Sequence, residues 1–420
     1  MKDRRGLFSW CLYDWANSAF PTVVITFVFA TYFTGSVAAD KVSGTAHWGY
    51  AMSLSALAVA IVAPVFGAMA DKGGGRKPWL GFFTALCIAL SAALWLIEPD
   101  PSFAVMALVL VGMANFAFET GMVFYNAMLP GLAPHSHVGR VSGWGWGLGY
   151  FGGLICLALT LVGLVQPQTP WFGLDKETAE HVRAAALLVA VWYAVFSLPL
   201  FLFTADKARR PGGSFFATLK MGLRELKTTF MEVRQYGDIV KFLIARMIYT
   251  DGLNTLYAFG GIYAAGSFGM VLDEIIIFAI GMNVTAGLGA AAFGWVDDAI
   301  GPKKTIMIAL IGLSILSAAL LIVEGKTLFW AFGLPLGLFV GPAQAASRSM
   351  MARLAPPHLS TEMFGLFAFS GKATAFLGPA LLGAVTAAFD SQRAGMATIL
   401  VFFALGMILL ARVPAVSGET

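Results

Sequence analysis

Six ionisable side chains lie inside long apolar stretches of the sequence: Asp14, Glu119, Arg246, Asp251, Arg348 and Lys372. Placing an Asp, Lys or Arg at the centre of a lipid bilayer costs about 2.5–3.5 kcal/mol on insertion scales. If the stretches cross a membrane, these side chains must therefore face protein or water. There they could bind a charged solute, carry a proton or pair with one another. The mixture of both charges suits a solute that is itself a zwitterion.

Lys372 and Glu119 are the most informative members of this set. Lys372 lies about ten residues into its stretch, roughly 15 Å deep at 1.5 Å per residue. It is either a cavity-lining cation that binds substrate or one partner of a buried ion pair. Glu119 shares a helix face with Asn126, seven residues further on. Because low dielectric favours a protonated carboxyl group, Glu119 is a candidate for a coupling proton; a permanent pair with Lys372 or Arg246 is the alternative.

Further polar residues accompany these charges at helical spacing: Asn17 follows Asp14, Asn254 follows Asp251, and Gln344 precedes Arg348. The two Asp–Asn pairs have the same spacing, which indicates a shared role in two related halves. Arg348 either binds substrate or extends toward the membrane interface from the end of its helix.

The stretches that must position these residues are long enough to span a membrane. Hydrophobic residues make up 58% of the 420 residues and charged ones only 12%, against about 25% in soluble domains. A span needs roughly 20 apolar residues, and the sequence predicts twelve spans, at about 8–34, 48–70, 79–97, 103–129, 142–165, 183–204, 239–265, 274–296, 305–323, 328–351, 363–388 and 394–412. We expect an all-α integral membrane protein.

The connecting segments predict the orientation of these spans. Lys and Arg residues gather in alternate segments, which are expected to be cytoplasmic and so place both termini inside the cell. A long segment, 205–238, carries a charged turn and then an amphipathic helical pattern that would lie on the inner membrane face. It separates the bundle expected over 1–204 from the one expected over 239–420.

Three local matches, in the same order, indicate that the two halves are repeats. The first pairs Asp14 and Asn17 with Asp251 and Asn254. The second follows the second span of each half and pairs Gly67, Asp71, Arg76 and Lys77 with Gly294, Asp298, Lys303 and Lys304. The third pairs Leu132-Ala133-Pro134 and Gly143 with Leu354-Ala355-Pro356 and Gly365.

Other classes of function find little support. The three cysteines lie in apolar stretches without metal-ligand spacing, and the five histidines lie in loops or at span ends. We therefore expect no enzyme activity, no metal and no cofactor. The net charge of +4 follows the expected membrane topology, which disfavours a nucleic-acid partner.

The duplicated Gly-x-x-x-Asp loop, with one residue inserted before Arg76, resembles the signature of the major facilitator superfamily, and the resemblance extends over essentially the whole chain. It implies twelve transmembrane helices in two pseudo-symmetric six-helix bundles, with the loop acting as a conformational latch. Four further segments look like the branch that contains the fungal vacuole effluxer of autophagy: 13–18, 124–130, 344–349 and 371–374. The fourth span lacks an arginine and the fifth lacks a Gly-Pro pair, which leaves the coupling mode open.

Together these features predict a secondary active transporter that works by alternating access. The expected solute is an amino acid or short peptide, with a proton as the candidate coupling ion. An exporter of apolar drugs or lipids is the alternative, and a non-transporting membrane sensor is a further one. We expect a monomer in the lipid bilayer, in the inner membrane if the source is bacterial.

Overall fold

The computed structural model describes the chain except residues 1–3, 74, 207–221, 223, 225–235 and 416–420, and every regular element in the described part is helical. The principal helices are α1 (Arg4–Asn17), α3 (Lys41–Gly73), α4 (Lys77–Ala93), α5 (Ala104–Leu132), α6 (Val138–Thr160), α7 (Glu180–Phe203), α9 (Gly237–Phe268), α10 (Leu272–Ile300), α11 (Pro302–Ile322), α12 (Lys326–Leu354), α13 (Ser360–Ser370), α14 (Leu377–Phe389) and α15 (Gln392–Ala411). The predicted amphipathic helix in 205–238 falls largely outside the described residues.

Ten helical segments of the described chain are long and apolar enough to cross a membrane. They correspond to ten of the twelve predicted spans and confirm those ten as helices. A helix suits a lipid environment because it satisfies its backbone hydrogen bonds internally. The two stretches outside this set are α9, which is long, and the stretch that contains α13 and α14.

The span predicted over 363–388 contains an interruption, because α13 ends at Ser370 and α14 begins only at Leu377. Between them the backbone forms turns in which several hydrogen bonds join residues three apart, such as Lys372 N to Phe369 O at 3.0 Å. Gly371 is a poor helix former. Pro379 has no N–H, and its ring would clash with the carbonyl of residue 375 in a continuous helix. The helix is therefore interrupted before Pro379.

The chain divides into two compact units. The first comprises Met1–Val62, Gly73–Met128 and Leu148–Pro211, with α7 packed against α1 and α4. Its core is aromatic: the rings of Trp10 and Tyr125 stack at 4.4 Å, and Trp10 Nε1 donates to Tyr125 O. The buried Tyr13 hydroxyl bonds the hydroxyls of Thr84 and Tyr193 at 2.6 and 2.8 Å.

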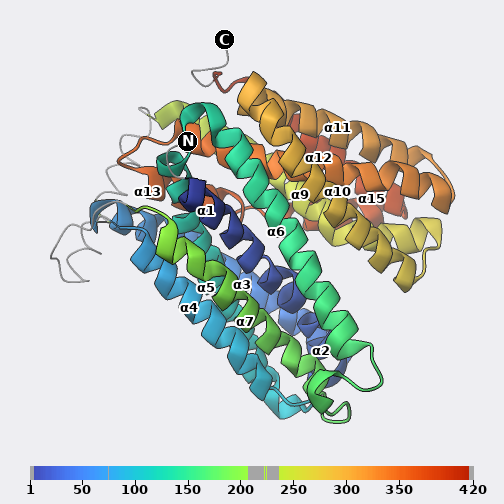
Figure 1. Cartoon of the computed structure of the whole chain (residues 1–420). Coiled ribbons are helices and arrows are strands. Elements are labelled where there is room, and N and C mark those ends of the chain that lie inside the picture. Colours follow the sequence, from blue (N-terminus) through green and yellow to red (C-terminus); the bar gives the residue numbers. More distant parts are fainter. Residues whose placement is uncertain (1–3, 74, 207–221, 223, 225–235, 416–420) are drawn as a thin grey trace. The chain divides into compact units, whose positions relative to one another are not determined.

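The second unit comprises Ala63–Lys72, Leu129–Gly147 and Gly212–Thr420. In it α12 packs against α10 and α11, and α15 packs against α9 and α11 (Figure 1). Two short segments from the first half of the sequence thus belong to the unit that holds the second half. The first segment, Ala63–Lys72, is the end of α3 and carries Gly67 and Asp71. The second, Leu129–Gly147, comprises the end of α5 and the start of α6 and carries the first copy of the third repeat.

Candidate functional site

In the first unit, Asp14 and Asn17 are both buried on α1. Asn17 Nδ2 lies 3.5 Å from Met122 Sδ of α5, and α1 continues after Ser18 as a π-helical segment, η1 (Phe20–Phe27). A Cβ on Gly149 of α6 would lie 3.5 Å from Asp14 Cβ and 2.7 Å from Ser18 Oγ. The small glycines of α6 therefore allow a close approach to the polar part of α1.

Glu119 and Asn126 are both partly exposed on α5. The same helix carries Asn115, whose side chain donates to Ser55 Oγ of α3 at 2.9 Å. The polar face of α5 therefore includes one residue that bonds a neighbouring helix and two that keep some exposure.

In the second unit, Arg246 of α9 binds the C-terminal end of α13. Its Nη1 donates to Phe367 O at 2.6 Å and to Ser370 Oγ at 2.7 Å, and its guanidinium lies 3.5 Å from the centre of the Phe367 ring. A cation at this position complements the partial negative charge of a helix C-terminus. Arg246 thus stabilises the end of the helix at the interruption.

Lys372 lies within that interruption, and it is partly exposed. Asp251, on α9, is 1% exposed, whereas Asn254 keeps partial exposure. Thr374, also in the interruption, places its hydroxyl beside the Asp251 carboxylate. The structure thus brings Arg246, Asp251 and the segment that contains Lys372 together in one unit, and it adds Thr374, which the sequence analysis did not single out.

Arg348 of α12 is 1% exposed, so it does not extend to an interface. Its Nε donates to Ser142 Oγ at 2.9 Å and its Nη2 to Ser142 O at 2.7 Å, while the guanidinium lies 5.6 Å from the centre of the Trp146 ring. Ser142 in turn donates to Ala345 O at 2.7 Å. Arg348 therefore joins α12 to α6, whereas Gln344, one turn earlier, is partly exposed.

The first repeated loop bonds a helix from the other half of the sequence. Asp71 accepts hydrogen bonds from Thr361 N at 2.7 Å, Glu362 N at 2.9 Å and Thr361 Oγ1 at 2.7 Å. Because α13 begins at Ser360, these amides are among the four that a helix N-terminus leaves without internal partners. Asp71 caps a helix that lies 290 residues away in sequence.

The second repeated loop makes the reciprocal contact. Asp298 accepts from Gly139 N at 2.9 Å and Arg140 N at 3.2 Å, in the first turn of α6, and pairs with Arg140 Nε at 2.6 Å. Arg353 of α12 adds a bond to Asp298 at 3.1 Å and one to Asp297 at 3.0 Å. Asp297 and Arg353 were not among the predicted residues.

Glycines let the helices approach at both contacts. A Cβ on Gly67 would meet backbone atoms of Thr361 and Glu362, and one on Gly365 would lie 2.6 Å from Ala63 O. In the reciprocal contact, Gly143 faces the backbone of Ala290 and Gly294, and Gly294 faces Gly139 and Arg140. The first copy of the second repeat therefore packs against the second copy of the third repeat, and the second copy of the second repeat packs against the first copy of the third.

The basic residues of the two loops have a separate role. Lys77 Nζ donates to Phe201 O near the end of α7, and Lys303 Nζ donates to Ala411 O and Val413 O at the end of α15. The backbone amides of Arg76 and Lys77 both bond Asp206, a further residue that the sequence analysis missed. Lys304 is exposed.

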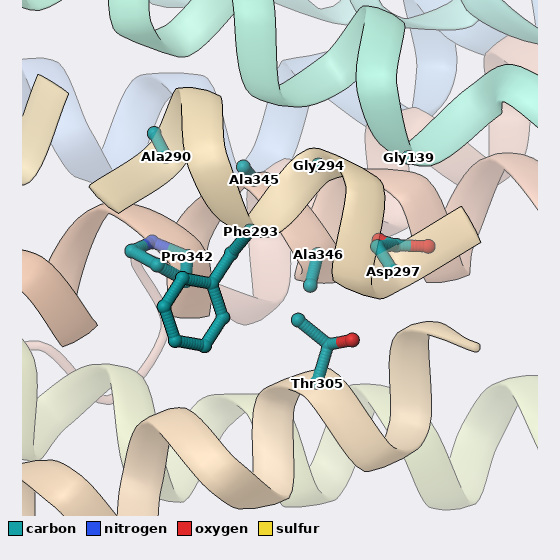
Figure 2. Close-up of a pocket in the computed structure, with 9 residues that line it drawn as sticks. All are labelled: Gly139, Ala290, Phe293, Gly294, Asp297, Thr305, Pro342, Ala345 and Ala346. Carbon is teal, nitrogen blue, oxygen red and sulfur yellow. The ribbon is translucent and has the colours of Figure 1, made fainter. Parts of the chain in front are cut away.

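A small pocket beside the second contact shows how tightly this region packs. Figure 2 shows Phe293, Gly294 and Asp297 on one helix, with Gly139, Thr305, Ala345 and Ala346 around the same space. The pocket leaves no room for a water molecule. Within the described part of the chain, no group of three or more His, Cys, Asp or Glu residues could hold a metal ion.

Relatives by sequence include a bacterial MFS-type transporter and fungal autophagy-related proteins. The chain is 26% identical over 412 residues to an uncharacterized MFS-type transporter, YxiO, of Bacillus subtilis, covering 97% of this chain and 94% of that protein. It is 24% identical to autophagy-related protein 22-1 of Penicillium rubens over 295 residues, 64% of this chain and 48% of the fungal protein. The chain thus spans about half the length of that fungal relative.

Solved structures share the fold at low sequence identity. The human organic anion transporter MFSD10 aligns with a TM-score of 0.74 at 14% identity, over 97% of this chain and 99% of that one. The proton:xylose symporter XylE aligns with a TM-score of 0.73 at 12% identity, over 99% and 97%. XylE is a protein of the major facilitator superfamily. The model of the vacuole effluxer Atg22-like family matches residues 2–420 of this chain. The chain therefore belongs to the Atg22-like family of MFS transporters.

Proposed function

We propose that this protein is a secondary active transporter that moves a small zwitterionic solute, an amino acid or a short peptide, by alternating access. The proposal assigns the twelve predicted spans to two six-helix bundles, with α9 as the seventh span and α13 plus α14 as the eleventh. Membership of the vacuole effluxer Atg22-like family supports a transporter that exports its solute.

The observation that carries the mechanism is the reciprocal pair of caps made by Asp71 and Asp298. Each carboxylate holds the first turn of a helix from the other half of the sequence through backbone amides. Such charge-assisted bonds contribute about 1.5–3 kcal/mol each, enough to bias an equilibrium and yet reversible. We assign the two caps, together with the Arg348–Ser142 contact, to a latch that holds one of the two access states.

The choice of a zwitterion depends on the charges of the second unit. Arg246 and Lys372 supply positive charge at the interrupted helix, and Asp251 supplies negative charge. A proton is the proposed coupling ion, and Glu119, an acidic residue that is partly exposed on α5, is its proposed carrier.

Counterflow in proteoliposomes tests the proposal directly. The purified protein is reconstituted with unlabelled amino acids or dipeptides inside, and uptake of the labelled solute is measured with and without a pH gradient. Exchange should occur for members of this panel and should fall to the level of empty liposomes in Lys372→Ala. The matched control is Lys41→Ala, at an exposed residue that begins α3. Full exchange by Lys372→Ala would show that the proposed site is wrong.

A further inference from the structure

The interruption between α13 and α14 lies directly against α9. On one side, Arg246 holds Phe367 and Ser370 at the end of α13. On the other side, a Cβ on Gly378 in the first turn of α14 would lie 2.9 Å from Asp251 O and would meet the Thr255 hydroxyl. The turns at 371–376 therefore cover the part of α9 that carries Asp251.

Two buried oxygen atoms lie in this region, one on Asp251 and one on Thr374. Asp251 is 1% exposed and the Thr374 hydroxyl lies beside its carboxylate, to which it can donate, but neither Asp251 Oδ2 nor Thr374 Oγ1 has any other hydrogen-bond partner. Leaving a buried polar group unsatisfied costs about 1–3 kcal/mol, and more if it is charged. Native proteins therefore leave few such groups without a reason.

The chemistry of the pair decides what it can bind. A carboxylate oxygen and a hydroxyl oxygen together complement a cation that carries N–H donors. Further along the same turns, the N-terminus of α14 is the positive end of a helix dipole, and Lys372 adds a formal positive charge to this segment. The interruption thus offers negative charge at one point and positive charge at another, as the ammonium and carboxylate of an amino acid require.

We propose that Asp251 Oδ2 and Thr374 Oγ1 bind the ammonium group of the transported solute, whose carboxylate lies toward the N-terminus of α14. This assignment rests on the proposed function and specifies the solute as one with a free primary amine. Arg246 is then a positioning residue: it binds the end of α13 and so maintains the interruption. The turns are part of the site because they carry Thr374 and Lys372.

The test compares solutes that differ only in the amine. L-alanine, L-leucine and L-phenylalanine are each paired with the α-hydroxy acid of the same side chain, and counterflow is measured for both members of each pair. Wild-type protein should favour the amine in at least one pair by about tenfold or more, the ratio expected for one charge-assisted hydrogen bond. Asp251→Asn and Thr374→Val should each reduce that ratio, and Thr374→Ser should retain it.

Thr398→Val serves as the matched control. Thr398 is a buried threonine whose hydroxyl bonds its own helix, at Gly395 O, so its removal should leave the amine preference unchanged. Each variant is first shown to elute as a folded particle in gel filtration. If Asp251→Asn does not fold, Thr374→Val still tests the proposal through the ratio.

The outcomes separate this inference from the proposed function. No exchange of any solute in the panel would overturn the proposed function and the inference with it. Equal exchange of amines and hydroxy acids by wild type, or a ratio unaffected by Asp251→Asn and Thr374→Val, would overturn the inference while transport stands. Replacing sodium by choline provides one further arm. An equal loss of exchange for amines and hydroxy acids would assign the two oxygens to a sodium ion, which also overturns the inference.

Discussion

Removing the negative charge of Asp71 should release the first of the two caps. In Asp71→Asn, the side-chain carbonyl can still accept from the two α13 amides, which both bond Oδ2, but these bonds lose the charge that strengthens them. The loss is about 1–1.5 kcal/mol for each of the two bonds, together with an interaction with the helix dipole of about 0.3–1 kcal/mol. The sum, about 2–4 kcal/mol, would shift the latched population by roughly 30-fold to 1,000-fold.

Cysteine labelling measures this shift. Ser360, the first residue of α13, is 1% exposed, so a cysteine at this position should react with a maleimide only when the cap opens. The native residues Cys11, Cys87 and Cys156 are buried and are replaced to remove background. In Ser360→Cys protein, Asp71→Asn should raise the labelling rate at least tenfold. The affinity for solute of protein that is already held in one access state should stay unchanged.

A second carboxylate in the chain provides the control. Asp40 accepts hydrogen bonds from Val42 N and Ser43 N, both at 2.9 Å, and thus caps the helix that follows it directly in sequence. Asp40→Asn removes the charge from the same kind of helix cap without altering a contact between the two halves of the sequence. An unchanged labelling rate in Asp71→Asn, or an equal increase in Asp40→Asn, would refute the latch.

Two further predictions concern the close helix contacts. Gly365→Ala should lower the thermal unfolding temperature, because its Cβ would lie 2.6 Å from the backbone oxygen of Ala63 and overpacking costs about 1–3 kcal/mol. Gly383 faces open space, so Gly383→Ala should not lower this temperature. Equal unfolding temperatures for the two variants would contradict this reasoning. Arg348→Lys should also destabilise the fold, because an ammonium cannot reproduce the two directed bonds to Ser142; a double-mutant cycle with Ser142→Ala should give a coupling of about 1 kcal/mol or more, and additive effects would argue against the contact.

Hydropathy and local motifs predicted much of the fold. Ten of the predicted spans correspond to apolar helices, because the preference for lipid is a sum over neighbouring residues and needs no knowledge of tertiary contacts. The repeats at Asp71 and Asp298 were also visible in sequence, and both loops proved to make equivalent contacts. The interruption of the eleventh stretch was missed because average hydropathy is insensitive to backbone hydrogen bonding. Pro379, together with Gly371, was the available signal.

The identity of each partner was decided only by the tertiary structure. Nothing near Arg348 in sequence indicates Ser142, 206 residues away, and the sequence offered substrate binding or an interfacial position instead. Asp251 was recognised as a costly intramembrane charge, but the hydroxyl beside it belongs to Thr374, which carries no charge and leaves no hydropathy signal. The sequence by itself thus determined which residues are expensive to place in lipid, because that cost is a property of the side chain. Which groups offset the cost depends on how distant helices pack.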